Sequence, residues 1–392
     1  MLGKMKLSSD RINRLPPYLF AEIDRIKMEA LSKGKDIIDM GVGDPDLRPP
    51  EVVIERLRQS ATQDGMHNYA SYNGTPGLRT AFARWFKRRF NIELDPDKEV
   101  LPLLGSKEGI GHIYLGVTDP GDEVLVPDPG YPVYMSGAIL TGAVPVRYPL
   151  REENSFLPDM DELNTLCSPR TRMIWVNYPS NPTTSLASLE TFEELVEFAV
   201  DKGILLCQDA AYSEIVFDGK RSPSILQVNG AKETAVEFFS LSKTYCMPGW
   251  RVGFAVGNPS ILSSLGRVKT NLDSGIFLPV QEASMIALDE CDAYVDANRR
   301  IFENRRNRFM AALRDAGLNL DSPSATFYVW MPVPDGYSSM DYTRYLLEEA
   351  GIVCTPGIGF GPTGEGFVRI SLTVNDGVLE KAMERIRGLR GA

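Results

Sequence analysis

The stretch that decides the fold is Phe238-Phe239-Ser240-Leu241-Ser242-Lys243-Thr244-Tyr245-Cys246-Met247-Pro248-Gly249-Trp250-Arg251-Val252-Gly253. An apolar, strand-like run leads here into a lysine that follows two serines and precedes a Gly-Trp-Arg turn. The amine of Lys243 can condense with an aldehyde, while Ser240, Ser242 and Arg251 can bind a phosphate dianion through charge-assisted hydrogen bonds. The pattern favours a site for a phosphorylated aldehyde. A surface lysine after a buried strand is the alternative interpretation.

Around this stretch, short apolar runs alternate with amphipathic segments such as Leu189–Asp201, which is typical of a mostly parallel sheet covered on both faces by helices. The expected strands are Val100–Leu104, Glu123–Val126, Met173–Val176, Ile204–Cys207, Val236–Phe239 and Val252–Val256. The first five each run into a polar or Gly/Pro loop, namely residues 105–107, 127–131, 177–182, 208–212 and 240–243. Because ligands of open α/β sheets bind beyond the carboxyl ends of the strands, we expect these loops to meet at one pocket.

The rest of the chain indicates a second, smaller α+β domain, since 392 residues exceed the size at which one core usually keeps growing. One long helix is expected from Val280 through Leu313, and its charged segment around Arg299–Arg308 is typical of a solvated face. After it we expect strands at 327–331 and 366–372 and helices at 340–349 and 379–389.

Composition and charge argue against several classes of function. The chain has 42 Lys and Arg residues against 52 Asp and Glu, a net charge of −10, so we expect neither nucleic acid nor membrane as a partner. The five cysteines form no C-x-x-C pair and the histidines are His67 and His112, which argues against a zinc site or a Ser-His-Asp triad, and no metal is expected. The sequence shows neither an apolar leader nor a run of ~20 apolar residues, so we expect a cytoplasmic protein.

The ordered set Asn181, Asp209, Tyr212, Lys243 and Arg251 is more specific than any single motif. Through these five residues and the sequence around each of them, the chain is similar to the fold-type-I pyridoxal-phosphate aminotransferases of class I and II. The similarity extends from the segment at 41–46 (GVGDPD) to the segment at 368–371 (VRIS). The resemblance spans essentially the whole chain. It implies a large domain at 47–285 with a mostly parallel seven-stranded sheet between helices, a smaller α+β domain at 286–392, and an N-terminal segment at 1–46 that packs with the smaller domain.

The resemblance also implies how the cofactor, pyridoxal 5'-phosphate, is held. Asp209 would pair with the protonated pyridine nitrogen, although a helix N-cap is the simpler role for an aspartate at that position. Asn181 and Tyr212 would hydrogen-bond the phenolic oxygen, and a plain turn is the alternative for residues 179–182. Tyr131 would stack on the ring face or fill the core. Lys243, Asp209 and Tyr212 are the residues expected to act in catalysis.

The phosphate of the cofactor is expected at the start of the helix after Gly105. Ser106 and Lys107 open that helix, and its backbone N–H groups suit an anion. Ser240, Ser242 and Arg251 complete the expected cradle. Tyr69 matches the family position that reaches the phosphate of the neighbouring subunit, which implies a homodimer with shared active sites.

Substrate contacts follow from the same resemblance. Arg369 would clamp the α-carboxylate of the substrate bidentately, with a strand-end ion pair as the alternative. Gly43 would add a backbone N–H to the same carboxylate, beside Asn181. Tyr18 would close over the substrate, and Tyr18, Tyr72 and Lys107 are expected near its distal end.

Three segments, at 14–20 (RLPPYLF), 105–110 (GSKEGI) and 270–277 (TNLDSGIF), look most like the aminotransferases that act on LL-diaminopimelate. This implies transamination between LL-diaminopimelate or tetrahydrodipicolinate and 2-oxoglutarate or glutamate, in lysine biosynthesis. Tyr72 departs from that group, whose members can carry an acidic residue there. Two alternatives stay open: another class I enzyme acting on aspartate, alanine, methionine or aromatic amino acids, or a pyridoxal-phosphate-dependent C–S lyase.

Overall fold

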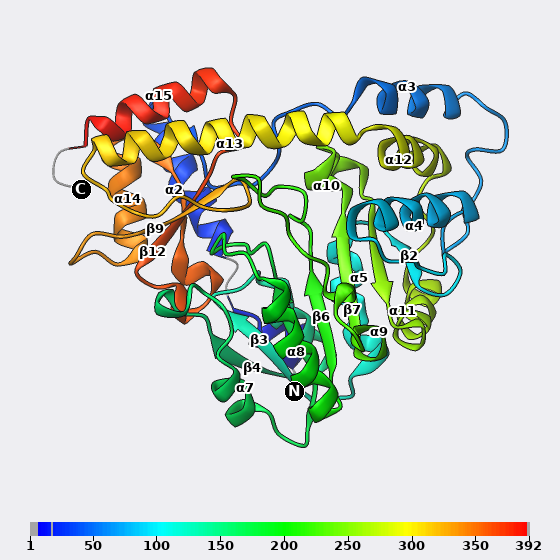
Figure 1. Cartoon of the computed structure of the whole chain (residues 1–392). Helices are drawn as coiled ribbons and strands as arrows, with labels where there is room; N and C mark the ends of the chain where they lie inside the picture. Colours follow the sequence, from blue (N-terminus) through cyan, green and yellow to red (C-terminus); the bar gives the residue numbers. More distant parts are fainter. Residues whose placement is uncertain (1–6, 17–18, 390–392) are drawn as a thin grey trace, which may run out of the picture.

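The computed structural model describes residues 7–16 and 19–389, and a seven-stranded sheet forms its centre (Figure 1). The strand order is β2-β8-β7-β6-β5-β3-β4. These strands are β2 (Val100–Leu103), β3 (Glu123–Asp128), β4 (Val144–Pro149), β5 (Thr171–Asn177), β6 (Leu205–Asp209), β7 (Ala235–Ser240) and β8 (Gly253–Gly257). Strand β8 is antiparallel to β2 and β7, and the other neighbouring pairs are parallel. The predicted mostly parallel seven-stranded sheet is confirmed.

Helices cover both faces of this sheet because its strands are apolar on both sides. In β3, Leu125 belongs to the core beneath one face, whereas Val124 and Val126 belong to the core beneath the other. The first face is covered by α3 (Glu51–Ser60), α4 (Pro76–Phe90), α7 (Met160–Leu166), α8 (Leu189–Lys202), α9 (Ala231–Thr234) and α12 (Leu278–Glu290). The second face is covered by α5 (Ser106–Val117), α6 (Val133–Thr141) and α11 (Pro259–Leu272).

A smaller antiparallel sheet follows in the chain, with the order β11-β12-β9. Its elements are β9 (Tyr328–Pro332), β11 (Thr355–Pro356) and β12 (Phe367–Ser371), with α13 (Asp292–Asp315), α14 (Ser339–Glu349) and α15 (Asp376–Arg387) packed against them. Phe309, Leu346 and Met383 belong to the separate core that these helices share with the sheet. The expected smaller α+β part is present.

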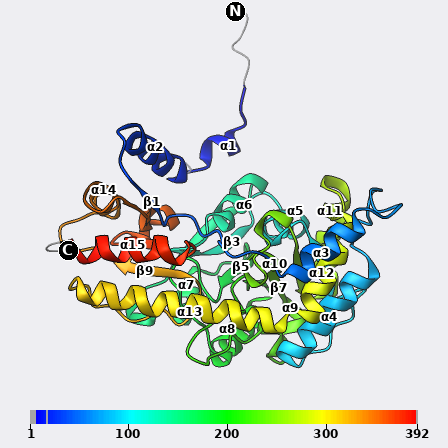
Figure 2. The ribbon, with the colours of Figure 1, turned by 90° about the horizontal axis from the view of Figure 1, so that it is seen from above.

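The N-terminal segment contacts both parts of the molecule (Figure 2). Strand β1 (Ile38–Asp39) pairs in parallel with β10 (Ile352–Val353), and helix α2 (Leu19–Ser32) packs on the same region through Ile23 and Ala30. Helix α1 (Asp10–Arg14), in contrast, lies on α6, where Arg11 Nη1 donates to the carbonyl of Leu140 at 3.0 Å. The expected division into an N-terminal segment at 1–46, a large domain at 47–285 and a small domain at 286–392 stays a proposal.

The expected single helix from Val280 through Leu313 is wrong, because α12 and α13 meet at Cys291. Cys291 leaves helical geometry with φ −108° and ψ 27°. Asp289 and Glu290 lie at the end of α12, where carboxylates oppose the helix dipole, whereas Asp292 begins α13, where a carboxylate is favoured. The local charges therefore favour ending one helix and starting another. Helix α13 then runs from the large sheet to the small one (Figure 1).

Strand β4 has no counterpart among the expected strands, because Pro145 and Pro149 interrupt its apolar pattern. It lies at the edge of the sheet, where a proline that cannot donate a hydrogen bond is tolerated. Across residues 7–16 and 19–389, no helix is both long and apolar enough to span a membrane.

Candidate active site

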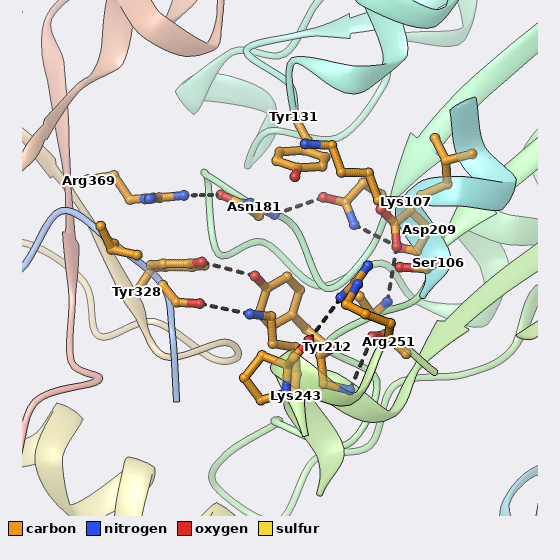
Figure 3. A pocket seen from close by; sticks show the side chains of 18 of the residues that line it. Ser106, Lys107, Tyr131, Asn181, Asp209, Tyr212, Lys243, Arg251, Tyr328 and Arg369 are labelled. Atoms are coloured by element: carbon orange, nitrogen blue, oxygen red, sulfur yellow. Dashed lines mark hydrogen bonds between the residues drawn. The ribbon is translucent and has the colours of Figure 1, made fainter. Parts of the chain in front are cut away.

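A cavity of about 430 Å³ lies between the carboxyl ends of the central strands and the smaller sheet (Figure 3). Its lining includes residues from the loops after β2, β3, β5, β6 and β7, so the predicted convergence of these loops is observed. Of the residues expected in the site, the cavity brings together Gly43, Ser106, Lys107, Tyr131, Asn181, Asp209, Tyr212, Ser240, Ser242, Lys243, Arg251 and Arg369. Their roles toward a cofactor or substrate are proposals, which we take up below.

Two expected residues are not part of this lining. Tyr69 and Tyr72 lie on the loop between α3 and α4, where their exposed fractions are 96% and 44%. Neither lines the cavity of its own chain. Tyr18 lies outside the described residues. The reach of Tyr69 into a neighbouring subunit therefore stays a prediction.

Lys243 owes its position to the short helix α10 (Leu241–Thr244), which follows directly on β7. Ser240 caps this helix, since its hydroxyl accepts from the Ser242 N–H at 3.2 Å. The Lys243 amine is half-buried and donates to the carbonyl of Gly43 at 2.7 Å. Burial lowers the pKa of Lys243, which favours the neutral, nucleophilic amine.

Asp209 ends β6 and is buried at the base of the cavity. The Tyr134 hydroxyl donates to its Oδ2 at 2.8 Å and the Ala211 N–H donates to its Oδ1 at 3.2 Å. Burial raises the pKa of Asp209 to about 6, because these two neutral donors compensate the loss of water only in part. Such a carboxylate is suited to a cationic partner inside the cavity.

Asn177 was not singled out from the sequence, although it joins the two loops that carry Asn181 and Asp209. Its Nδ2 donates to the Asp209 carbonyl at 2.7 Å, and its Oδ1 accepts from the Asn181 N–H at 2.9 Å. Asn177 and Asp209 are direct neighbours in the register of β5 and β6. A polar residue at the end of each of two adjacent strands is the signal that could have revealed it.

Arg369 on β12 is 3% exposed and is held rigidly. Its Nη1 donates to Asn181 Oδ1 and its Nη2 donates to the Gly41 carbonyl, both at 2.7 Å. The guanidinium lies 4.2 Å from the centre of the Tyr328 ring, and its buried Nε has no hydrogen-bond partner in the described structure. Arg369 is therefore not a surface arginine, and its geometry fits an anion that enters the cavity.

Tyr328 is a second residue that the sequence did not reveal, since a tyrosine in the apolar run 327–331 reads as core. Its hydroxyl lies 3.0 Å from that of Tyr212, and its ring supports Arg369. A Cβ atom at Gly43 would lie 1.7 Å from the Tyr328 hydroxyl oxygen. Only glycine fits there, so Tyr328 fixes how closely the backbone at Gly43 approaches the site.

The opposite end of the cavity is suited to a phosphate. Gly105, with φ +79°, turns the chain into α5, so the first N–H groups of that helix and the Ser106 hydroxyl face the same region as Ser240 and Ser242. Arg251 Nη2 donates to the carbonyl of Leu104 at 3.3 Å and lies 2.0 Å from where a Cβ atom at Gly105 would be. The guanidinium thus rests on the glycine itself.

Comparison with known proteins identifies the family. The sequence matches the family "Aminotransferase class I and II" over residues 35–386, and the chain belongs to this family. Among curated relatives, it is 49% identical to an LL-diaminopimelate aminotransferase of Aquifex aeolicus, over 97% of this chain and 99% of that one. It is 48% identical to the LL-diaminopimelate aminotransferase of Syntrophobacter fumaroxidans, over 98% and 99% of the two chains.

Solved structures agree on the fold. Apo-BacF from Bacillus subtilis superposes with a TM-score of 0.94 at 33% identity, covering 98% of this chain and 99% of that one. A mutant aspartate aminotransferase of Thermus thermophilus gives 0.92 at 29% identity, covering 98% and 100%. The fold expected from the sequence resemblance is confirmed.

Proposed function

We propose that this aminotransferase uses pyridoxal 5'-phosphate to transfer an amino group between LL-diaminopimelate and 2-oxoglutarate, in the direction that lysine biosynthesis requires. One observation supports the cofactor most directly: a half-buried lysine amine, a buried carboxylate that only neutral donors contact, and a helix-opening turn suited to an anion line one cavity. Similarity to the LL-diaminopimelate aminotransferases over 97–98% of the chain supports the substrate.

The residues present fit pyridoxal phosphate at each of its polar groups. The turn at Ser106 with Arg251 suits the phosphate, Asp209 suits the pyridine nitrogen, and Asn181 and Tyr212 suit the phenolic oxygen. When bound, the cofactor supplies an aldehyde for capturing amines and a cationic ring that withdraws electrons from the substrate Cα.

Lys243 is the group that takes and returns the substrate proton. With its amine free, Lys243 could accept the proton from Cα of the substrate as a general base. Its lowered pKa raises the fraction of neutral amine near pH 7. The Gly43 carbonyl, which accepts a hydrogen bond from Nζ at 2.7 Å, helps to hold the amine beside the substrate-facing backbone.

Asp209 is proposed to act as an ionised carboxylate, whereas Tyr212 is proposed to act as a neutral, protonated hydroxyl. A bound pyridinium would give the Asp209 carboxylate a cationic partner beside its neutral donors Tyr134 and Ala211, so the carboxylate would stay ionised and favour a protonated ring nitrogen. Burial raises the pKa of Tyr212 well above its ordinary value, so its hydroxyl stays neutral and can donate a hydrogen bond. Tyr328 orients that hydroxyl from behind.

Arg369 binds the α-carboxylate that both substrates share. Its buried Nε and its face toward the cavity leave donors for a carboxylate, while Asn181 and Tyr328 fix the plane of the guanidinium. The distal ends of the substrates differ, an amino-acid zwitterion in one and a carboxylate in the other. Mobile groups such as Lys107, or bridging water, can serve both ends better than a second fixed arginine.

A different amino-acid aminotransferase is the second candidate, because Tyr72 stands where enzymes specific for diaminopimelate can carry an acid. The test compares kcat/KM for LL-diaminopimelate with that for aspartate, alanine, methionine and aromatic amino acids. We expect diaminopimelate to lead. If another amino acid exceeds it tenfold, a difference of ~1.4 kcal/mol in transition-state binding, the substrate assignment is wrong while the aminotransferase assignment stands.

We further propose a cytoplasmic homodimer with shared active sites. An almost fully exposed tyrosine, Tyr69, on a loop that also carries the exposed Tyr72 is expected where a second subunit supplies the surroundings. The acidic net charge of −10 supports small-molecule substrates rather than nucleic acid or anionic membrane as the other partners.

A further inference from the structure

Four charged or titratable side chains cluster behind the phosphate end of the cavity. Glu108 and His112 come from α5, Lys269 from α11, and Asp273 from the C-cap of α11. None of them lines the cavity. Lys269 is only 1% exposed, which is rare for a lysine and requires compensating partners.

The contacts within the cluster are close. Lys269 Nζ donates to both carboxylate oxygens of Asp273, at 3.0 and 3.2 Å, and to Glu108 Oε2 at 3.4 Å. His112 Nδ1 lies 2.8 Å from Glu108 Oε1 and 3.6 Å from Asp273 Oδ2. Glu108, His112 and Asp273 could by their spacing hold a metal ion, but the Lys269 ammonium already binds both carboxylates.

Leu104 links the cluster to Arg251, which lies at the expected phosphate site. The N–H of Leu104 contacts the cluster, and its carbonyl contacts Arg251. Glu108 Oε2 accepts from the Leu104 N–H at 3.0 Å, whereas the Leu104 carbonyl accepts from Arg251 Nη2 at 3.3 Å. The turn is thus held from behind by Glu108 and from the cavity side by Arg251. The next residue, Gly105, is a glycine and can adopt many backbone conformations, so hydrogen bonds on both sides of Leu104 would restrict the conformations of the turn.

The chain segment that follows Asp273 lies against the loop of Tyr69. Asp273 is followed within two residues by Gly275, where a Cβ atom would lie 2.3 Å from the carbonyl oxygen of Ser71 and 2.9 Å from that of Ala70. This close approach places the segment after Asp273 directly against the backbone that follows Tyr69. The cluster therefore contacts the turn expected at a cofactor phosphate, and the segment that follows its Asp273 contacts the loop of Tyr69.

We propose that Glu108, His112, Lys269 and Asp273 form a positioning network that holds the Leu104–Ser106 turn in the conformation that binds the cofactor phosphate. This inference rests on the proposed function, since the anion is taken to be the phosphate of pyridoxal phosphate. Glu108 is its central member, because it alone contacts Lys269, His112 and the Leu104 N–H.

The experiment compares how the apoprotein binds pyridoxal phosphate and pyridoxal, which lacks the phosphate. For Glu108→Ala we expect the Kd of pyridoxal phosphate to rise by about tenfold or more, while the Kd of pyridoxal stays within about twofold. His112→Gln, which keeps a hydrogen-bonding side chain, is expected to shift the same Kd less and serves if Glu108→Ala folds poorly.

Asp218→Ala is a matched control, since it removes the carboxylate partner of another buried cation, Arg306, and these two side chains contact each other, Glu303 and Pro323 rather than the turn or the cluster. It should change neither Kd. An equal loss of both ligands in Glu108→Ala and His112→Gln, or no loss in either variant, would overturn the network. If the wild-type apoprotein binds pyridoxal phosphate no more tightly than pyridoxal, the proposed function fails, and this inference fails with it.

Discussion

Replacing Asp209 by asparagine should stabilise the protein without its cofactor, although it should destroy activity. Burial raises the pKa of Asp209 from 3.8 to about 6. Between these two pKa values the native apoprotein holds a proton that the unfolded chain releases. Ionising the buried carboxylate as the pH rises therefore lowers the free energy of unfolding. A pKa difference of about two pH units corresponds to about 3 kcal/mol of lost stability above pH 6.

The dependence on pH follows from the sign of this pKa difference. A group whose pKa is raised in the folded state contributes its full stability below the unfolded value of 3.8 and loses it as the pH rises through about 6. Asparagine avoids the cost of ionisation and can still accept from the Ala211 N–H. We expect the Asp209→Asn apoprotein to be more stable than the wild type by up to about 3 kcal/mol at pH 8, and by roughly half as much at pH 5.

The assay is denaturant unfolding of both apoproteins at pH 5 and pH 8, at equal protein concentration. Asp218→Asn provides a control of opposite sign, because Arg306 lowers the pKa of Asp218. That variant should lose stability at pH 8. In the loaded enzyme Asp209→Asn should reduce kcat at least about hundredfold, or ~2.7 kcal/mol, since an amide cannot keep the ring nitrogen protonated. An Asp209→Asn apoprotein that is less stable than the wild type at pH 8 would refute the reasoning.

Two further predictions concern the substrate clamp and the dimer. Arg369→Lys should lower kcat/KM for both substrates about hundredfold, because an ammonium cannot replace the planar contacts to Asn181, Gly41 and the Tyr328 ring; loss with one substrate alone would mean that Arg369 does not bind the shared carboxylate. Mixing an inactive Tyr69→Phe variant with inactive Lys243→Ala should restore part of the activity, since some hybrid dimers keep one intact site; no recovery after verified subunit exchange would show that Tyr69 acts within its own chain or not at all.

The elements that the sequence predicted well are those with a strong local pattern. Buried parallel strands are short apolar runs, and the polar residue that ends each run, such as Asp209 at the end of β6, marks the edge of the sheet. The break at Cys291 escaped prediction because no proline or glycine marks it. Strand β4 escaped because Pro145 and Pro149 look like breakers until the edge position is known.

The parts of the site that could not be predicted depend on contacts across long stretches of chain. Tyr328 meets Tyr212 across 116 positions, and Tyr134 meets Asp209 across 75. Tyr328 and Tyr134 each look like a core residue when the sequence around them is considered alone. Lys269 is a comparable case, since a lysine on a helix is expected in solvent until tertiary packing brings Glu108 beside it.

We propose that Lys243 carries the cofactor of a transaminase. The most direct test of this proposal is borohydride reduction of the loaded protein, followed by mass spectrometry of its peptides, with and without prior addition of glutamate. We predict that reduction attaches the phosphopyridoxyl group covalently to Lys243. Glutamate added first should prevent this attachment, because it would convert the cofactor to its aminated form, which is not bonded to the lysine. Attachment to another lysine, or labelling of Lys243 that glutamate leaves unchanged, would contradict the account.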